Sequence, residues 1–290
     1  MSQRVHVAGI IPLANLETDH ESNLPDSMVS VDAGFTAIQK SVFECAVAGC
    51  KTIWIVANSD LAPVVRHCVG DWVYDPVYYN RTKVRFYREV RKEIPIYYVP
   101  IDYRDTDRRD SYGWSVLHGV NSAWWVGNKI SKWLVPEKYF ISFPMSAHDI
   151  YSLREHRKEI ADPKANFFLT YDNKTVKDNL PLSFAMKGED YIQCRRKINK
   201  ETTREFLPPL KGEKYPSRRL PLQERWSAKG FDFRQVFGQV DTSCATTAEL
   251  EWFYDISAWK EYRKFLGSEH SIKKPYKGLT GPHKHATLIE

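Results

Sequence analysis

The chain has 290 residues, of which 42% are hydrophobic and 27% charged, and its formal net charge is +6. This composition is typical of a soluble globular protein, and the length is sufficient to bury a sizeable core. No apolar run approaches the roughly 20 residues of a membrane-spanning helix, so the sequence excludes one. The five cysteines form no CxxC pair, and together with the absence of an N-terminal signal segment they predict reduced thiols in a cytoplasmic protein.

The first seventy residues have the pattern of one strand–loop–helix–strand unit. Residues 5–14 are an apolar strand candidate, and residues 15–25 form a polar loop. A helix is predicted at 36–48, followed by Gly49 and a second apolar strand at 52–57. This order indicates a right-handed crossover between parallel strands. The first loop is then expected at the carboxyl edge of the sheet, where open α/β folds bind ligands.

Helices and strands continue to alternate up to about residue 171. The strand at 139–143 is apolar except for Ser142, which is typical of a strand buried on both faces. Strands are predicted at 96–101, 139–143 and 165–171. A short helix is predicted to end at about Cys68, and further helices are predicted at 79–92, 114–126 and 149–160.

The pattern becomes weaker between residues 173 and 232, where prolines and charges predict an irregular insert rather than a separate domain. An apolar strand is then expected at 235–240. From about Thr246 to Leu266, apolar side chains recur at steps of three and four and predict one long helix. We therefore expect a single domain over residues 1–267, with the insert at about 173–232, and a basic tail over 268–290.

These elements predict an α/β fold of three layers, in which a mostly parallel mixed sheet is flanked by helices. Several segments also occur in the order found in one enzyme family. Ala8-Gly9 stands at the first turn, and residues 24–31 and 48–56 match the segments that follow it. Residues 110–115 and Asp241-Thr242 match two later ones. In these segments, over roughly residues 4–145 and 233–266, the chain resembles the sugar-phosphate nucleotidyltransferases of the glycosyltransferase-A-like fold.

The resemblance implies transfer of a nucleotidyl group to a sugar phosphate, with Mg²⁺ as cofactor. It implies a divalent metal on Asp241, and the second candidate metal ligand is Asp149, the carboxylate nearest to the end of the strand at 139–143. The nucleotide-binding residues that it implies lie at the two predicted turns, and they are Ala8, Gly9, Ile10, Ser111 and Gly113. No catalytic side chain can be named from the sequence.

Two departures from the family pattern leave other functions open. No Gly-x-Gly-x-Arg follows Gly9, and Asp26 stands where the family has a phosphate-binding lysine. One alternative is a glycosyltransferase with a nucleotide-sugar donor, for which Asp105-Thr106-Asp107 has the spacing of a metal motif. The other is a non-catalytic binding protein that retains the fold. The basic segments also leave a nucleic acid open as a partner.

Overall fold

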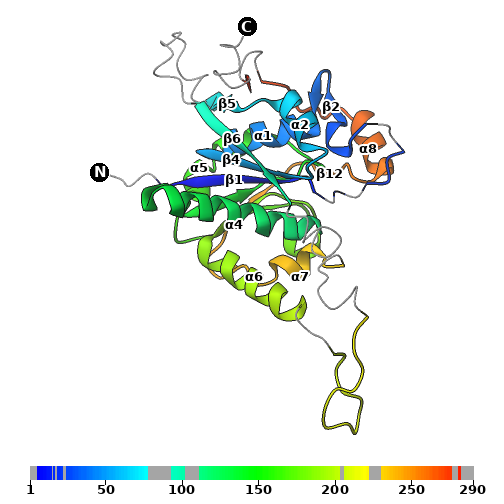
Figure 1. Cartoon of the computed structure of the whole chain (residues 1–290). Coiled ribbons are helices and arrows are strands. Elements are labelled where there is room, and N and C mark those ends of the chain that lie inside the picture. The colour runs from blue at the N-terminus through cyan, green and yellow to red at the C-terminus, as the bar shows by residue number, and fades with distance from the viewer. Residues whose placement is uncertain are drawn as a thin grey trace.

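The computed structural model describes residues 5–14, 16, 18–21, 24–77, 93–101, 111–202, 206–221, 230–275 and 280–281. Within these residues, nine strands form one sheet in the order β11-β9-β10-β7-β1-β4-β6-β5-β13 (Figure 1). In chain order the nine strands are β1 (Val7–Pro12), β4 (Thr52–Ala57), β5 (Trp72–Tyr74), β6 (Glu93–Pro100), β7 (Lys138–Ile141), β9 (Phe167–Thr170), β10 (Phe184–Lys187), β11 (Thr246–Glu249) and β13 (Thr280–Gly281). Two small pairs lie outside the sheet, β2 (Ser30–Asp32) with β3 (Phe35–Thr36) and β8 (Ser146–Ala147) with β12 (Tyr254–Asp255).

Most of the sheet is parallel. Strand β1 pairs in parallel with β4 and β7, β4 pairs with β6, and β9 pairs with β11. Strand β10 lies antiparallel between β7 and β9, and β5 is antiparallel to β6. Every residue of β1 is buried, as expected for a parallel strand covered on both faces. The expected mostly parallel mixed sheet is confirmed.

Helices cover both faces of the sheet (Figure 1). One face carries α1 (Ala37–Ala48), α2 (Ala62–Val69) and α5 (Arg157–Ile160), and the other carries α4 (Tyr112–Ile130), α6 (Gly188–Thr202) and α7 (Phe233–Phe237). The buried side chains accordingly form two large clusters, one on each side. The three expected layers are therefore confirmed. No helix of the described residues has the length and apolarity that crossing a bilayer requires.

The region from 173 to 232 is more regular than the sequence predicted. It contains β10 and α6, and β10 is an interior strand of the sheet. The expectation of an irregular insert was wrong here, because a four-residue strand is too short to show periodicity and α6 is rich in charged residues. Residues 206–221 do lack helices, and they project away from the sheet (Figure 1).

The predicted helix at 246–266 is also wrong. The chain forms β11, then β12, and only then a helix, α8 (Trp259–Leu266). Local β-propensity at the paired threonines 246 and 247 prevails over the apolar spacing, because β11 can pair with β9. The predicted strand at 235–240 is instead the end of α7, whose capping box joins Asp232 and Gln235.

Two smaller predictions need correction. The single helix expected at 149–160 is a 3₁₀ turn, η4 (Ile150–Arg154), followed by α5. The expected tail is ordered at least in part, since Ile272 is buried and β13 pairs with β5. The basic helix predicted at 79–92 and the charged loop at 102–110 lie outside the described residues.

A fully buried ionic cluster joins α1 to the end of β7. Lys40 Nζ donates to Glu44 Oε2 at 3.0 Å and to the Phe143 carbonyl at 2.9 Å. Ser142 Oγ donates to the same carboxylate at 2.7 Å, and His148 Nε2 lies 3.3 Å from Glu44 Oε1. Burial raises the pKa of Glu44, but the charge of Lys40 and the contact with His148 outweigh it and keep the pKa well below its usual range.

Removing one partner of this cluster should destabilise the fold strongly. We expect Lys40→Met to lower the free energy of unfolding by about 3 to 5 kcal/mol, because it leaves a buried carboxylate without its counter-charge. Adding Glu44→Gln to Lys40→Met removes the buried negative charge, and the glutamine amide can still form hydrogen bonds with Ser142 and His148. The double variant should therefore be more stable than Lys40→Met in urea unfolding. If Lys40→Met unfolded at the same urea concentration as the wild-type chain, Lys40 would not stabilise the fold by compensating the charge of Glu44.

Candidate functional site

The carboxyl edge of the parallel strands brings together the first loop and the start of α4. At the end of β1, the backbone N–H groups of Leu13 and Ala14 both donate to the Val56 carbonyl, at 2.7 and 3.1 Å. From the first turn of α4, Ser115 Oγ donates to the Ala14 carbonyl at 3.1 Å. These bonds fix the chain that leaves β1 against the N-terminus of a 19-residue helix.

The start of α4 is a favourable position for an anionic group. Ser111 caps the helix, because its side chain accepts a hydrogen bond from the Trp114 N–H at 3.1 Å. The free N–H groups and the dipole of a long helix favour negative charge at this end. Ser111, which the sequence predicted as a nucleotide-binding residue, thus lies next to the loop that follows β1.

The other predicted residues at the first strand are differently placed. Ala8, Gly9 and Ile10 lie inside β1 and pair with β4 on one side and β7 on the other. A Cβ at Gly9 would lie 2.8 Å from the Cys45 sulfur, so the glycine allows α1 to pack closely on the strand. These three residues do not reach the edge, since β1 continues to Pro12. Their assignment to nucleotide binding stays a prediction, which this position within the strand does not favour.

Gly113 is close to the edge but covered by another helix. A Cβ there would lie 2.8 Å from Val236 Cγ2, so the glycine lets α7 pack on the first turn of α4. Next to it, Tyr112 contacts Phe143 at the end of β7 and Phe233 of α7, with ring centroids 5.5 and 5.6 Å apart. These rings close one side of the edge.

Sequence analysis missed a carboxylate at this edge, Asp255. Strand β8 follows β7 along the chain and pairs with β12, in a register that places Asp255 opposite Ser146. The Ile256 N–H also donates to the Met145 carbonyl at 2.8 Å. Burial raises the pKa of the Tyr112 hydroxyl strongly, and the negative charge of Asp255 adds to this shift. The side chain of Asp255 is held by the Ser257 N–H at 3.1 Å and the Ser257 hydroxyl at 2.6 Å.

The loop after β1 is attached to the same segment. The Asp19 N–H donates to the Ser257 carbonyl at 3.2 Å, and the Asp19 carboxylate accepts from the Trp259 N–H. The His20 ring stacks on Tyr262 with centroids 5.2 Å apart. The first loop and the segment around Asp255 therefore form one continuous wall of the edge, on the right of Figure 1.

Asp241 lies at the other edge of the sheet. Its backbone carbonyl accepts from Asn166 Nδ2 at 2.8 Å, and its carboxylate is 3.9 Å from Lys187 Nζ. Asn166 precedes β9 and Lys187 ends the antiparallel β10, so both mark the amino edge of the parallel strands. Hydrogen bonds from Ser243 lower the pKa of Asp241. The structure does not bring Asp241 together with the first loop.

Asp149, the second predicted metal ligand, caps η4. Its carboxylate accepts from the Tyr151 N–H at 2.9 Å, and the residue is exposed. In the described part of the chain, no three His, Cys, Asp or Glu side chains are grouped as a metal site. Mg²⁺ is commonly held by one or two carboxylates together with substrate phosphates and water, and the described carboxylates of this segment are Asp255 and Asp19.

An aromatic and acidic pocket of about 520 Å³ adjoins Asp255. It lies beyond the carboxyl ends of β9 and β11, between these strands and α8. The Trp252 ring stacks on His270 with centroids 4.7 Å apart. Lys174 and Lys264 also line the pocket, and Lys264 pairs with Glu261. The carboxylates of the lining are Asp172, Glu251, Asp255 and Glu261. Such a wall can contact the apolar face of a sugar ring while the carboxylates accept hydrogen bonds from its hydroxyls.

Some predicted residues cannot be placed. The arginines and the Asp105-Thr106-Asp107 spacing of the 102–110 loop lie outside the described residues, as does the basic segment at 79–92. Asp26 is described and begins a 3₁₀ turn, Asp26–Met28, that follows the first loop.

No protein-family profile matches the chain, and no curated protein matches it. Solved structures do. An apo UDP-glucose pyrophosphorylase superposes with a TM-score of 0.53 at 12% identity, over 91% of this chain and 97% of that one. A UDP-glucose pyrophosphorylase complexed with UDP-glucose gives 0.52 at 11%, with the same coverage. A Bacillus anthracis protein assigned as a glucose-1-phosphate thymidylyltransferase, in complex with a sucrose, gives 0.52 at 9%, over 93% and 98%.

At these identities the likeness concerns the fold, which extends over nearly the whole length of each chain. The ligands named for these proteins are UDP-glucose and a sucrose, so the nucleic-acid partner gains no support. The order of elements that pointed to nucleotidyltransferases in the sequence agrees with this result. The chain is a divergent protein with the fold of the sugar-phosphate nucleotidyltransferases.

Proposed function

We propose that the protein binds a nucleotide or nucleotide sugar at the carboxyl edge and transfers a nucleotidyl group to a sugar phosphate with Mg²⁺. The observation that supports this most directly is the convergence of three features at one edge. These are the loop after β1, the N-terminus of α4 and the carboxylate of Asp255. The nucleotidyltransferase fold makes this edge the expected place for a ligand.

In this proposal the phosphates of the nucleotide lie over the start of α4. The N–H groups of its first turn favour anionic oxygens, and Tyr112 and Phe143 provide an apolar wall beside them. Asp255 would hold Mg²⁺, and the chemistry that the metal would supply there is neutralisation of charge on the phosphates. Asp241 and Asp149 remain predictions as metal ligands, but the geometry favours Asp255 over both.

The acceptor sugar phosphate occupies the pocket next to Asp255. Trp252 of the pocket lies beside the sugar ring, and the carboxylates accept hydrogen bonds from its hydroxyl groups. An oxygen of the acceptor phosphate attacks the α-phosphorus of a nucleoside triphosphate, the bond to the β-phosphate oxygen breaks, and pyrophosphate leaves. The protein contributes mainly by positioning the two phosphates in line.

The primary test is the product released by the purified full chain. Incubation of nucleoside triphosphates with hexose 1-phosphates and Mg²⁺ should release pyrophosphate and form a nucleotide sugar, because both substrates fit one edge. Release of free nucleoside diphosphate from a nucleotide sugar would instead identify a glycosyltransferase. Binding of nucleotides in a thermal-shift measurement without either product would favour a non-catalytic binding protein.

Asp255 and Asp241 provide a matched pair of variants. Each carboxylate accepts two hydrogen bonds from the serine two residues later, but they lie at opposite edges of the sheet. We expect Asp255→Asn to lower the turnover number at least about 100-fold, because metal-ligand charge contributes several kcal/mol to transition-state stabilisation. Asp241→Asn should keep wild-type turnover. The reverse result would return the metal site to Asp241.

The acceptor pocket can be tested by measuring the KM for the sugar phosphate and the KM for the nucleoside triphosphate separately. Trp252→Leu removes the flat ring, and we expect it to raise the KM for the sugar phosphate about tenfold, the scale of one lost aromatic contact. The KM for the nucleoside triphosphate should not change, and Trp252→Phe should restore most of the loss. An equal rise in both constants would show that Trp252 supports the edge as a whole and does not contact the acceptor.

A further inference from the structure

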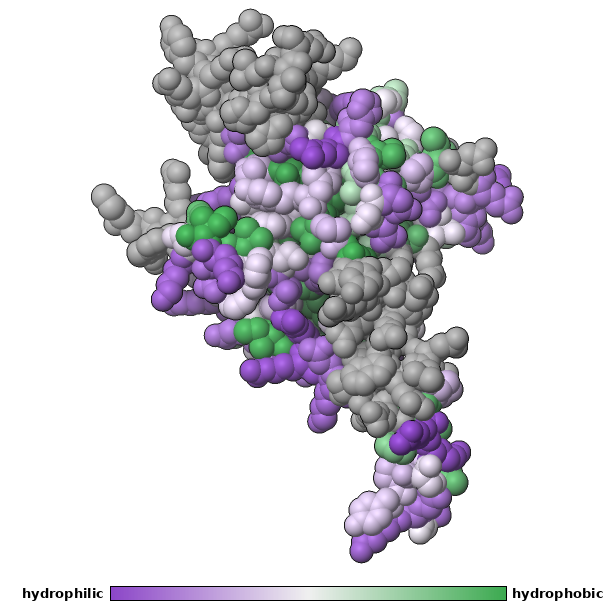
Figure 2. Space-filling model, in the orientation of Figure 1, coloured by the Kyte–Doolittle hydropathy of each residue, from purple (hydrophilic) through white to green (hydrophobic). Residues whose placement is uncertain are grey.

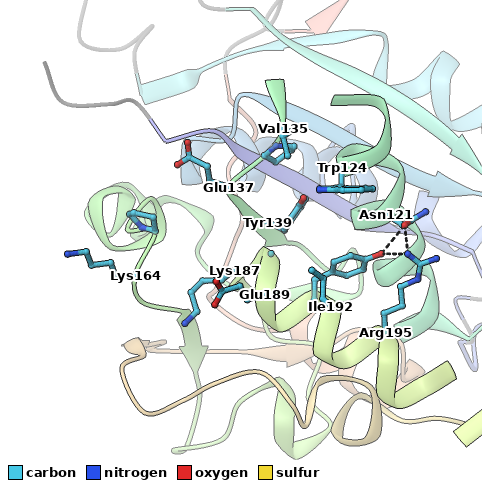
Figure 3. A pocket seen from close by; sticks show the side chains of 14 residues that line it. Asn121, Trp124, Val135, Glu137, Tyr139, Lys164, Lys187, Glu189, Ile192 and Arg195 are labelled. Carbon is cyan, nitrogen blue, oxygen red and sulfur yellow. Dashed lines mark hydrogen bonds between the residues drawn. The ribbon is translucent and has the colours of Figure 1, made fainter. Parts of the chain in front are cut away.

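A second, larger cavity lies on the other side of the molecule from Asp255. It has a volume of about 700 Å³ and opens between α4 and α6 (Figure 3). Its lining includes Tyr139 near the start of β7 and Lys187 at the end of the antiparallel β10. Lys187 pairs with Lys138 in the sheet register, so this is the amino edge of the parallel strands.

The cavity is distant from the proposed nucleotide site. Trp124, which forms part of its wall, stands 13 residues along α4 from Ser111, or about 20 Å at 1.5 Å per residue. A ligand of ordinary metabolite size cannot occupy both places. The cavity is therefore an independent feature of this chain.

One wall is aromatic and apolar. The large side chains of Trp124 and Ile192 face the solvent at its mouth, with exposed fractions of 43% and 44%. In Figure 2, hydrophobic residues gather at the left of the molecule, near the end of α4 as it is drawn in Figure 1. An apolar rim around a concave site of this volume is typical of pockets for small organic molecules.

A tyrosine hydroxyl group lies at the cavity. Tyr139 is only 1% exposed as a whole residue and forms part of the cavity lining. Figure 3 shows this oxygen directed toward the side of the cavity where Trp124 and Val135 lie. Burial raises the pKa of Tyr139, so that the group remains a neutral O–H. A neutral phenol O–H can donate a hydrogen bond to an acceptor atom of a ligand in the cavity.

The polar side of the cavity carries three cationic side chains, of which Lys187 also lies 3.9 Å from the Asp241 carboxylate. Arg195 Nη1 donates to Asn121 Oδ1 at 2.6 Å and to the Tyr191 hydroxyl at 3.2 Å, which holds the guanidinium on the wall. Two lysines line the opposite side in Figure 3. The cations of the lining are Lys164, Lys187 and Arg195, and its carboxylates are Glu137 and Glu189.

We propose that this cavity is a second ligand site, which takes a small ring compound carrying a phosphate monoester. The ring lies against Trp124 and accepts a hydrogen bond from the Tyr139 hydroxyl, and the phosphate lies among the cationic side chains. Flat aromatic walls bind bases and sugar rings, and guanidinium and ammonium groups bind phosphate. The site is separate from the proposed transfer reaction and does not depend on it.

Calorimetric titration of the full chain tests this site with two probes, uridine monophosphate and glucose 1-phosphate. Both are phosphate monoesters, but the first carries a nucleobase and the second only a sugar ring. We expect at least one probe to bind in the micromolar range. Trp124→Ala and Lys187→Gln should each raise its dissociation constant about tenfold or more. Tyr139→Phe, which removes only the hydroxyl, should raise it about three- to tenfold.

Trp125→Ala is the matched control, because Trp125 follows Trp124 on α4, is 54% exposed and is absent from the lining. It should bind the probe like the wild-type chain. If Trp124→Ala and Lys187→Gln bind both probes as tightly as wild type, the cavity is not the site. Failure of the wild-type chain to bind either probe at millimolar concentration would also overturn the proposal, whatever the result of the transferase assay.

Discussion

The buried charge of Glu44 is the constraint on which the candidate site depends. A carboxylate without access to water must be compensated by partners at fixed positions, and here these come from α1 itself and from the chain that follows β7. This fixes where residues 142–148 lie relative to the sheet. Strand β8 within that segment then provides the only described pairing partner of β12. The position of Asp255 thus follows, through β8, from an ionic cluster in the core.

The carboxyl edge is assembled from both ends of the chain. The loop after β1 contributes backbone groups and Asp19, α4 contributes its N-terminus, and the segment from β12 to α8 closes the site from the opposite end of the sequence. Close packing makes this convergence possible. Gly9 lets α1 approach β1, and Gly113 lets α7 approach α4. Both glycines therefore serve the architecture of the site.

The sequence predicted the half of the fold whose signals are local. The apolar run of β1, the capped helix α1 and the strand after Gly49 each have a pattern that few other structures share, and all three were found. Predictions failed where pairing decides the structure. The apolar spacing between Thr246 and Leu266 fits a helix, yet β9 and β8 offer strand partners that no local pattern shows. That error also concealed Asp255, since its run of aromatic neighbours and the Asp-x-Ser turn were interpreted as part of a helix.

By itself, the amino-acid sequence determined the α/β class, the parallel crossover at the N-terminus and the order of elements that resembles nucleotidyltransferases. These depend on hydrophobic periodicity and on turn residues, which act over a few positions. Only the tertiary structure decided which carboxylate stands at the ligand edge. Asp241 and Asp255 share one local motif, in which the aspartate carboxylate accepts a hydrogen bond from the serine two residues later. The direction of the strands beside them separates the two, because it assigns one to the amino edge and the other to the carboxyl edge of the same sheet.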